Sequence, residues 1–423
     1  MNILIVAIGS HGDVNPFIKI GTELRKRGHD VTILTNSYFS DSVQNAGLEF
    51  ISVGSVEEYN KMLDEVDLTN PTKTTKVIMN YLYFPSIQRI YDSISELNIP
   101  GETVVVGITM AFGARMVQEK LGIPMVTFHL APVSFPSISN PARMDGVWMP
   151  HWMPKFYKES IWWLIDKAAD MFLSPPINEM RNKLDLPPAK SIFRNWIHSP
   201  EKVIGLFPSW FAEPQPDWPK NTELTNFIFF DEADMNPMPL ELEEFTGHDV
   251  PTVVFTAGTA VKNAETFFKE SVKACEILNV RGVFLSRYKG HIPNDLPNII
   301  FYCEYAPFSK LLPISSALVH HGGIGTCAQA LRAGIPQLLT PFGMDQHDNS
   351  LRLTKLGGSD EVCMKKYKSS IVAEKIRRLL EDEEVQTSCK KIADKMKNID
   401  PLSDVCSLIE DHVHNWKSMQ NTS

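Results

Sequence analysis

The sequence has no closely spaced pair of cysteines. All six cysteines lie in the C-terminal half, and neighbouring ones are at least 17 positions apart. This spacing excludes a C-x-x-C metal or redox pair, and it predicts a chain whose thiols stay reduced, as in the cytoplasm.

Long apolar runs and an excess of basic residues are also missing. The longest uncharged stretch, Leu121 to Ala142, contains four prolines, so we expect no transmembrane helix. The apolar run before Gly9 is too short for a signal peptide and follows no basic residue. The 41 basic and 50 acidic residues give a formal charge of -9, which argues against a nucleic-acid-binding surface.

The chain is long and apolar enough for more than one hydrophobic core. It has 423 residues, of which 43% are apolar, so we expect two domains. The run before Gly9 predicts a strand, Asn15 and Pro16 predict the start of a helix that ends at Gly28, and residues 31–35 predict a second strand. This order implies a parallel sheet. Further strands are predicted at residues 103–107 and 124–128.

The second half repeats the alternation of strands and helices. Strands are predicted at residues 252–256, 282–286, 299–302 and 317–320. The acidic segment 231–249 contains two prolines and suits a linker. The sequence therefore predicts an α/β protein of two doubly wound, Rossmann-like domains, 1–230 and 250–400, facing each other across a cleft, with ligands bound where the strands end.

The most specific loop follows the last of these predicted strands. Gly322, Gly323 and Gly325 lie between that strand and a helix, where free backbone N–H groups and the helix dipole favour an anion. Thr326 adds a hydroxyl, and His320 at the strand end can donate to a phosphate oxygen. The alternative is a tight turn that binds nothing.

Two further loops follow predicted strands. Asp345 and Gln346 come after the next strand and suit the vicinal hydroxyls of a sugar, with a solvated loop as the alternative. Gly258 and Thr259 follow the strand at 252–256 and are a third phosphate-facing candidate. A simple turn is the alternative there.

The first loop of the chain, residues 9–13, lacks the G-x-G-x-x-G spacing of dinucleotide-binding proteins, which argues against hydride transfer with NAD. Asp13 is a candidate general base for an acceptor hydroxyl, and His11 can assist or compete. A helix beginning at Asn15 would keep Asp13 ionised and so make it a weaker base. The alternative is a charge that only stabilises the helix end.

Aromatic residues gather in one stretch, because seven of the eight tryptophans lie between positions 148 and 218, with methionines near them. This composition predicts either ordinary core packing or an apolar pocket for a lipophilic ligand. The candidates for that pocket are Phe135, Trp148, Met149 and Trp152.

Together these motifs resemble, nearly end to end, the nucleotide-sugar-dependent glycosyltransferases of family 1, which have the GT-B fold. The resemblance rests on residues 9–16, on the run from His320 to Thr326, and on Asp345 with Gln346. Within that family, residues 191–200, 206–212 and 217–219 are similar to the catalytic rhamnosyltransferase subunit of bacterial rhamnolipid synthesis.

The resemblance implies an inverting transfer, without a required metal, of rhamnose or glucose from a nucleoside diphosphate sugar to a hydroxyl of a lipophilic acceptor such as a hydroxy-fatty-acid lipid. It implies a base at Asp13 with His11 beside it. It also implies a sugar site at Asp345 and Gln346 and a nucleobase site at Tyr305 and Ala306. The implied diphosphate site comprises His320, Gly322, Gly323, Gly325, Thr326 and Thr259.

Two positions depart from the plant relatives. Phe308 replaces a glutamine of the base-binding turn, and Ala328 replaces the glutamate that holds the ribose hydroxyls. Loss of that carboxylate favours a deoxyribose, and hence dTDP over UDP, with Gln329 as a substitute acceptor.

The implied partners are the nucleotide sugar, the lipophilic acceptor and an enzyme that supplies the lipid. The inner face of the membrane is a further implied partner, and nucleic acid is not expected to bind. The tail 401–423 is expected to pack back onto the first domain, as in relatives. The alternatives are a UDP-glucosyltransferase of sterols or other lipophiles, a non-catalytic partner protein, and a nucleotide-sugar epimerase.

Overall fold

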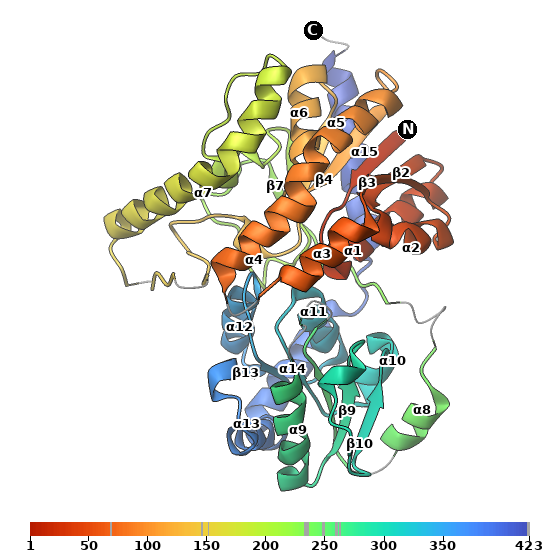
Figure 1. Ribbon diagram of the computed structural model, residues 1–423, viewed down its shortest axis with the longest axis vertical. Coiled ribbons are helices and arrows are strands. Elements are labelled where there is room, and N and C mark those ends of the chain that lie inside the picture. The colour runs from red at the N-terminus through yellow and green to blue at the C-terminus, as the bar shows by residue number, and fades with distance from the viewer. Residues whose placement is uncertain are drawn as a thin grey trace. The chain divides into compact units, whose positions relative to one another are not determined.

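The computed structural model describes residues 1–67, 70–144, 147–150, 152–231, 237–247, 250–258, 261 and 264–420. The chain forms two compact units (Figure 1). The N-terminal unit comprises Met1–Ile228 and Asp400–Ser423, and the C-terminal unit comprises Phe229–Ile399.

The N-terminal unit is built on a seven-stranded parallel sheet of order β3-β2-β1-β4-β5-β6-β7. Its strands are β1 (Asn2–Val6), β2 (Asp30–Asn36), β3 (Glu49–Gly54), β4 (Thr103–Ile108), β5 (Met125–His129), β6 (Lys202–Gly205) and β7 (Thr222–Leu224). All residues of β1, β4 and β5 are buried, as expected where helices cover both faces of a parallel sheet. The order of the strands reverses between β1 and β4, and that point is where doubly wound folds bind ligands.

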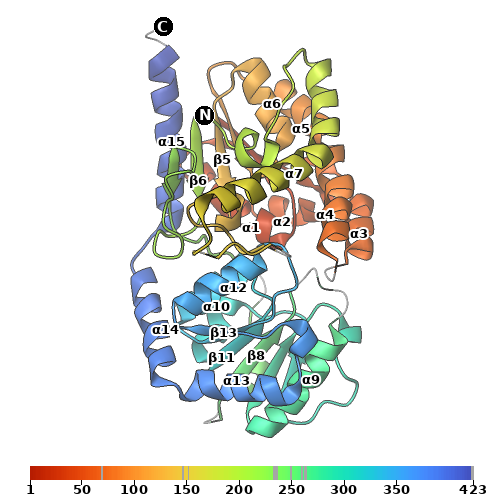
Figure 2. The same cartoon turned by 90° about the vertical axis from the view of Figure 1, so that its left-hand side faces the viewer.

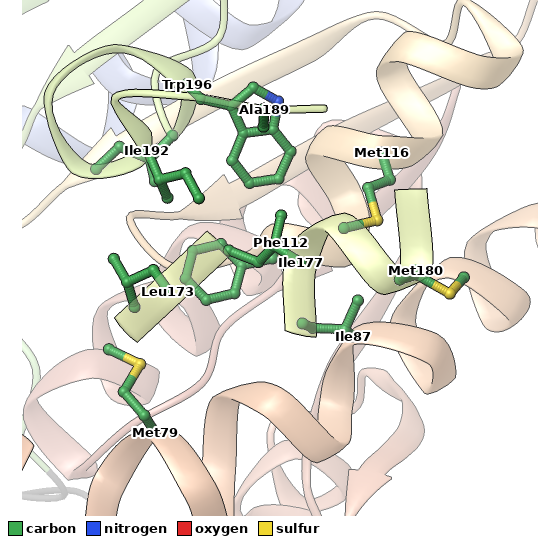
Figure 3. Packing of buried hydrophobic residues seen from close by; sticks show 11 residues of the cluster. Met79, Ile87, Phe112, Met116, Leu173, Ile177, Met180, Ala189, Ile192 and Trp196 are labelled. Atoms are coloured by element: carbon green, nitrogen blue, oxygen red, sulfur yellow. The ribbon is translucent and has the colours of Figure 1, made fainter. Parts of the chain in front are cut away.

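The helices of this unit are α1 (His11–Lys26), α2 (Ser40–Asn45), α3 (Val56–Glu65), α4 (Pro71–Ile78), α5 (Phe84–Leu97), α6 (Phe112–Leu121), α7 (Lys155–Lys183) and α15 (Pro401–Gln420). The second half of α7 packs on α5, α6 and the segment 189–197, with Ile177 and Phe112 at the centre of the cluster (Figure 3). This apolar contact fixes where the segment that contains His198 lies.

Helix α1 begins earlier than the sequence predicted. Ser10 and Asp13 form a capping box at its N-terminus, so that the helix starts at His11 rather than at Asn15. Pro16 therefore lies inside α1 rather than at its first position. The capping box takes precedence because it satisfies two backbone N–H groups that would otherwise lack partners.

The C-terminal helix α15 belongs to the N-terminal unit (Figure 2). Val405 and Ile409 are buried. Glu410 accepts hydrogen bonds from Arg27 Nη1 at 2.8 Å and from His29 Nε2 at 2.7 Å, so α15 is tied to the end of α1 and the turn that follows it.

The C-terminal unit repeats the design with six parallel strands of order β10-β9-β8-β11-β12-β13. The strands are β8 (Thr252–Thr256), β9 (Arg281–Leu285), β10 (Ile300–Cys303), β11 (Ala317–His320), β12 (Gln337–Leu339) and β13 (Ser359–Glu361). The helices are α8 (Leu240–Thr246), α9 (Glu265–Leu278), α10 (Phe308–Leu311), α11 (Ile324–Ala333), α12 (Gln346–Lys355), α13 (Ser369–Glu381) and α14 (Glu383–Met396). Here the order reverses between β8 and β11.

Part of the segment expected to be a linker is an ordered helix. Residues 240–246 form α8, and Leu242 is fully buried in a core cluster with Val254 and Val283 of the C-terminal unit. This part of the segment packs in a core because one side of α8 is apolar. The acidic composition of residues 231–249 as a whole gave no indication of that side.

Candidate active site

Asp13 lies at the point where the strand order of the N-terminal unit reverses. Its Oδ2 accepts hydrogen bonds from Ser10 N at 2.7 Å and from Ser10 Oγ at 2.8 Å. The loop comes close to this oxygen, because a Cβ at Gly9, where φ is +142°, would lie 2.4 Å from Oδ2. Burial raises the pKa of Asp13 against the lowering effect of Ser10. The carboxylate is therefore a stronger base than the helix end alone predicted.

His11 starts α1 and has aromatic neighbours. Its ring makes edge contacts with Tyr38 and Phe39, with centroids 5.5 and 5.0 Å away, in the segment that follows β2. Both base candidates thus lie in the first turn of α1, His11 among aromatic rings and Asp13 against the backbone of the loop.

A buried pair of histidines, which the sequence reasoning missed, lies at the same edge of the sheet. Thr109, just after β4, forms a hydrogen bond through Oγ1 with His129 Nδ1 at 2.8 Å, and His129 Nε2 pairs with His198 Nδ1 at 2.8 Å. Burial lowers the pKa of His129 well below its usual value and that of His198 to about 4. The available signal was a histidine directly after the strand predicted at 124–128.

The four acceptor-pocket candidates do not share one environment. Trp148 and Trp152 are 64% and 80% exposed, whereas Met149 and Phe135 are buried. Phe135 stacks on Trp218, with centroids 4.4 Å apart, and makes an edge contact with His129. Phe135 therefore belongs to the buried aromatic layer around the histidine pair, and the two exposed tryptophans do not.

In the C-terminal unit, His320 ends β11 and is fully buried. Its Nδ1 accepts from Gly322 N at 3.2 Å, so Nε2 carries the proton and donates to Gln337 Oε1 at 2.9 Å. Burial lowers its pKa to about 3. Because both ring nitrogens are engaged within the protein, His320 shapes the glycine loop and has no N–H left to donate to a phosphate.

His321, to which the sequence analysis assigned no role, lies between two of the candidate loops. A Cβ at Gly258, where φ is +89°, would lie 2.7 Å from His321 Cε1, and a Cβ at Gly323 would lie 2.5 Å from Nε2. His321 Nδ1 is buried and has no hydrogen-bond partner among the described residues. Burial lowers its pKa to about 4, so the ring is neutral at pH 7.

The glycine loop leads directly into α11. Gly322 adopts a φ of +93°, Gly323 is the N-cap residue, and α11 begins at Ile324. Gly325 is exposed and Thr326 half-buried. The first N–H groups of this ten-residue helix therefore remain available to an anion.

A hydrogen-bonded link connects the sugar-site candidates to this loop. Asn349 Nδ2, in α12, donates to Gly322 O at 3.0 Å and to Asp345 Oδ2 at 2.7 Å. Gln346 is nearly buried, and its Oε1 accepts from Phe342 N at 2.8 Å. The structure thus brings Asp345 close to the loop, while Gln346 holds the turn that presents it. Asn349 was missed because nothing in its spacing distinguishes it from a helix-surface residue.

The nucleobase-site candidates follow β10. Ala306 is buried in the core, and Tyr305 is half-buried. Thr259 lies outside the described residues. Within the described part of the chain, no group of three or more His, Cys, Asp and Glu residues is placed to hold a metal ion. The same residues include no helix that is long and apolar enough to cross a membrane.

Two family matches cover the two units in turn. Residues 3–138 match the glycosyltransferase family 28 N-terminal domain, and residues 283–409 match the C-terminal domain of proteins like erythromycin biosynthesis protein CIII. Among the solved structures, the kitacinnamycin glycosyltransferase is 18% identical with a TM-score of 0.74, over 97% of this chain and 99% of that one.

Sequence relatives extend over the whole chain. The O-mycaminosyltylonolide 6-deoxyallosyltransferase of Streptomyces fradiae is 26% identical over 100% of this chain and 99% of its own length. A sterol 3-beta-glucosyltransferase of Candida albicans is also 26% identical, over 94% of this chain but only 27% of its own length.

The two Rossmann-like units and these matches define a GT-B glycosyltransferase, which confirms the expected fold class and enzyme class. The enzyme is of the kind that takes its sugar from a nucleoside diphosphate. Its relatives are macrolide and sterol glycosyltransferases, and they do not support the finer resemblance to the rhamnosyltransferase of rhamnolipid synthesis.

Proposed function

We propose that this enzyme transfers a hexose, with inversion, from a dTDP-sugar to a hydroxyl of a lipophilic natural product or sterol. The observation that carries the proposal is the link from Gly322 through Asn349 to Asp345. It joins an anion-binding helix end to a carboxylate suited to sugar hydroxyls, at the carboxyl edge of a parallel sheet.

On the donor side, the diphosphate binds to the N–H groups at the start of α11 and to the Thr326 hydroxyl. His321 fills the space between this loop and Gly258, and its neutral ring offers a nitrogen to the ligand. His320 acts on the diphosphate through the conformation of the loop. Preorganised N–H donors of this kind stabilise the negative charge that grows on the leaving diphosphate.

The preference for dTDP rests on Ala328. This residue is buried in α11, at the position where the plant members of the family that the chain resembles have a glutamate for the ribose hydroxyls. Two solved structures of similar fold, VinC and SsfS6 from a Streptomyces species, contain dTDP. The hexose is rhamnose or another deoxyhexose, and glucose from UDP-glucose is the alternative that the sterol glucosyltransferase relatives suggest.

On the acceptor side, Asp13 takes the proton of the acceptor hydroxyl as it attacks the anomeric carbon. Its raised pKa suits this role, because a general base works best when its pKa approaches the working pH. A lipophilic acceptor is supported by the similarity to glycosyltransferases of a tylonolide and of sterols.

The proposal is tested first by thermal unfolding with dTDP, UDP and NAD at equal concentrations. A ligand at a hundred times its Kd stabilises the folded state by about 2.7 kcal/mol, so we expect a clear rise in Tm with dTDP and a smaller one with UDP. Mass spectrometry then follows hexose transfer from dTDP-rhamnose and UDP-glucose to a sterol, a hydroxy fatty acid and a macrolide lactone. Equal shifts with NAD and dTDP, or no transfer from either donor, would refute the proposal.

A further inference from the structure

The N-terminal half of α7 exposes apolar side chains on its outward side. Five of them define what we call the α7 outer face: Phe156, Tyr157, Trp163, Leu164 and Met171, each more than half exposed. Two more exposed tryptophans, Trp148 and Trp152, immediately precede the helix. Contiguous exposed apolar surface of this kind marks an interaction site rather than ordinary solvent-facing helix.

The inward side of the same helix half already packs against the N-terminal unit. Trp162 is buried and its Nε1 donates to Ser137 O at 3.0 Å. The C-terminal part of α7, which includes Leu173, Ile177 and Met180, packs into the core cluster with α5 and α6, while the N-terminal part extends away from it (Figure 1). The outer face therefore does not belong to the core of the N-terminal unit.

Charge distinguishes this surface from the rest of the protein. The two aspartates of the helix half point inward: Asp166 accepts from Ser191 Oγ at 2.8 Å, and Asp170 accepts from the N–H groups of Ser191 and Ile192 at 2.8 and 2.9 Å. Outward, the exposed charged residues between positions 152 and 171 are Lys155, Glu159 and Lys167. On a chain of net charge -9, the outer face is thus weakly positive.

We propose that the α7 outer face docks on the surface of a lipid bilayer. Tryptophan and tyrosine are the side chains that favour the membrane interface, and an amphipathic helix with lysines beside an apolar face lies in that plane. With two lysines against the single carboxylate of Glu159, this surface repels anionic headgroups less than the rest of this acidic protein does. Two copies of the chain, each of charge -9, repel each other, which disfavours a dimer through this face. The inference rests on the proposed function, since a lipophilic acceptor is met in the bilayer.

Vesicle flotation tests the docking without any sugar or acceptor. We expect the wild-type protein to float with vesicles of phosphatidylcholine containing phosphatidylglycerol. The double variant Trp163→Gln/Leu164→Gln should lose at least tenfold in partitioning, because two exposed apolar side chains no longer enter the lipid. Ile99→Gln/Leu121→Gln is the matched control. These two residues are exposed in the same unit but are not part of the α7 outer face, so partitioning should change less than twofold.

Absence of wild-type flotation, or an equal loss in the control variant, would overturn the proposal. So would a dimer by light scattering that Trp163→Gln/Leu164→Gln converts to a monomer, because the face would then bind a second copy. Nucleotide binding keeps the two proposals separate. A variant that no longer floats should keep the wild-type rise in Tm with dTDP, and flotation without any nucleotide-induced rise would refute the donor proposal while leaving the docking in place.

Discussion

Acidification should destabilise the N-terminal unit through the buried histidine pair. His198 is buried, with a pKa of about 4, whereas an unfolded histidine has a pKa of about 6.5. The unfolded state therefore binds the proton more readily, so this stabilising contribution is complete above pH 6.5 and is lost as the pH falls toward 4. At pH 5 protonation of His198 therefore raises the equilibrium constant for unfolding by a factor of about 30, which lowers the free energy of unfolding by about 2 kcal/mol.

The measurement is urea unfolding at pH 7 and pH 5, followed by tryptophan fluorescence. All eight tryptophans lie in the N-terminal unit, so the signal reports the unit that contains His198. The variant His198→Gln keeps an oxygen that can accept from His129 Nε2 but cannot take up a proton. Between pH 7 and pH 5, the free energy of unfolding should fall in both proteins. We expect the fall to be about 2 kcal/mol smaller in His198→Gln than in the wild type.

His414→Gln is the control, because His414 is an exposed histidine on α15 in the same unit. Its unfolding should keep the wild-type dependence on pH. If His198→Gln loses as much stability on acidification as the wild type does, the histidine pair is not held neutral by burial and the reasoning fails.

Two further predictions concern the proposed active site. Asp13→Asn should lower kcat by about 10²- to 10⁴-fold with an unchanged Kd for dTDP in calorimetry, because it removes the base. Ser10→Ala removes one hydrogen bond to Asp13 Oδ2 and should keep most of the turnover. Equal losses of kcat in the two variants would contradict the base role. Gly258→Ala should weaken dTDP binding by about tenfold or more, because the new Cβ would lie 2.7 Å from His321. The φ of +89° at this position also costs an alanine about 1 kcal/mol or more. Gly28→Ala has the same φ but no atom within 4 Å, so it should lower Tm without affecting dTDP binding.

The sequence by itself determined the strands and the loops that follow them. The predicted strands at 252–256 and 317–320 match β8 and β11. The one at 103–107 ends one residue before β4 does, and the one at 124–128 begins and ends one residue before β5. Runs of apolar residues between glycine-containing loops specify buried parallel strands almost locally. The strand ends therefore place Asp13, Asp345 and the glycine loop at the binding edge without tertiary information.

Only the tertiary structure decided which groups are free and which are engaged. His320 and His321 are adjacent in sequence, yet Gln337 and Gly322 occupy both nitrogens of the first, while the second keeps a buried Nδ1 without a partner in the described part of the chain. His129 and His198 are 69 residues apart, and they meet because β5 and β6 are neighbours. Local sequence cannot encode such outcomes, because burial and hydrogen-bond partners come from strand order and from packing between distant segments.

The exposure of Trp148 and Trp152 was decided in the same way. Composition alone left a pocket and a core as equal alternatives, and the structure instead separates these residues from the buried aromatic layer around Phe135. Trp148 and Trp152 precede α7, whose buried stripe is already filled by residues such as Trp162, so that other apolar side chains of that helix also face outward. A helix that is apolar on two sides can bury only one of them within a single unit, and which side that is depends on what packs against it.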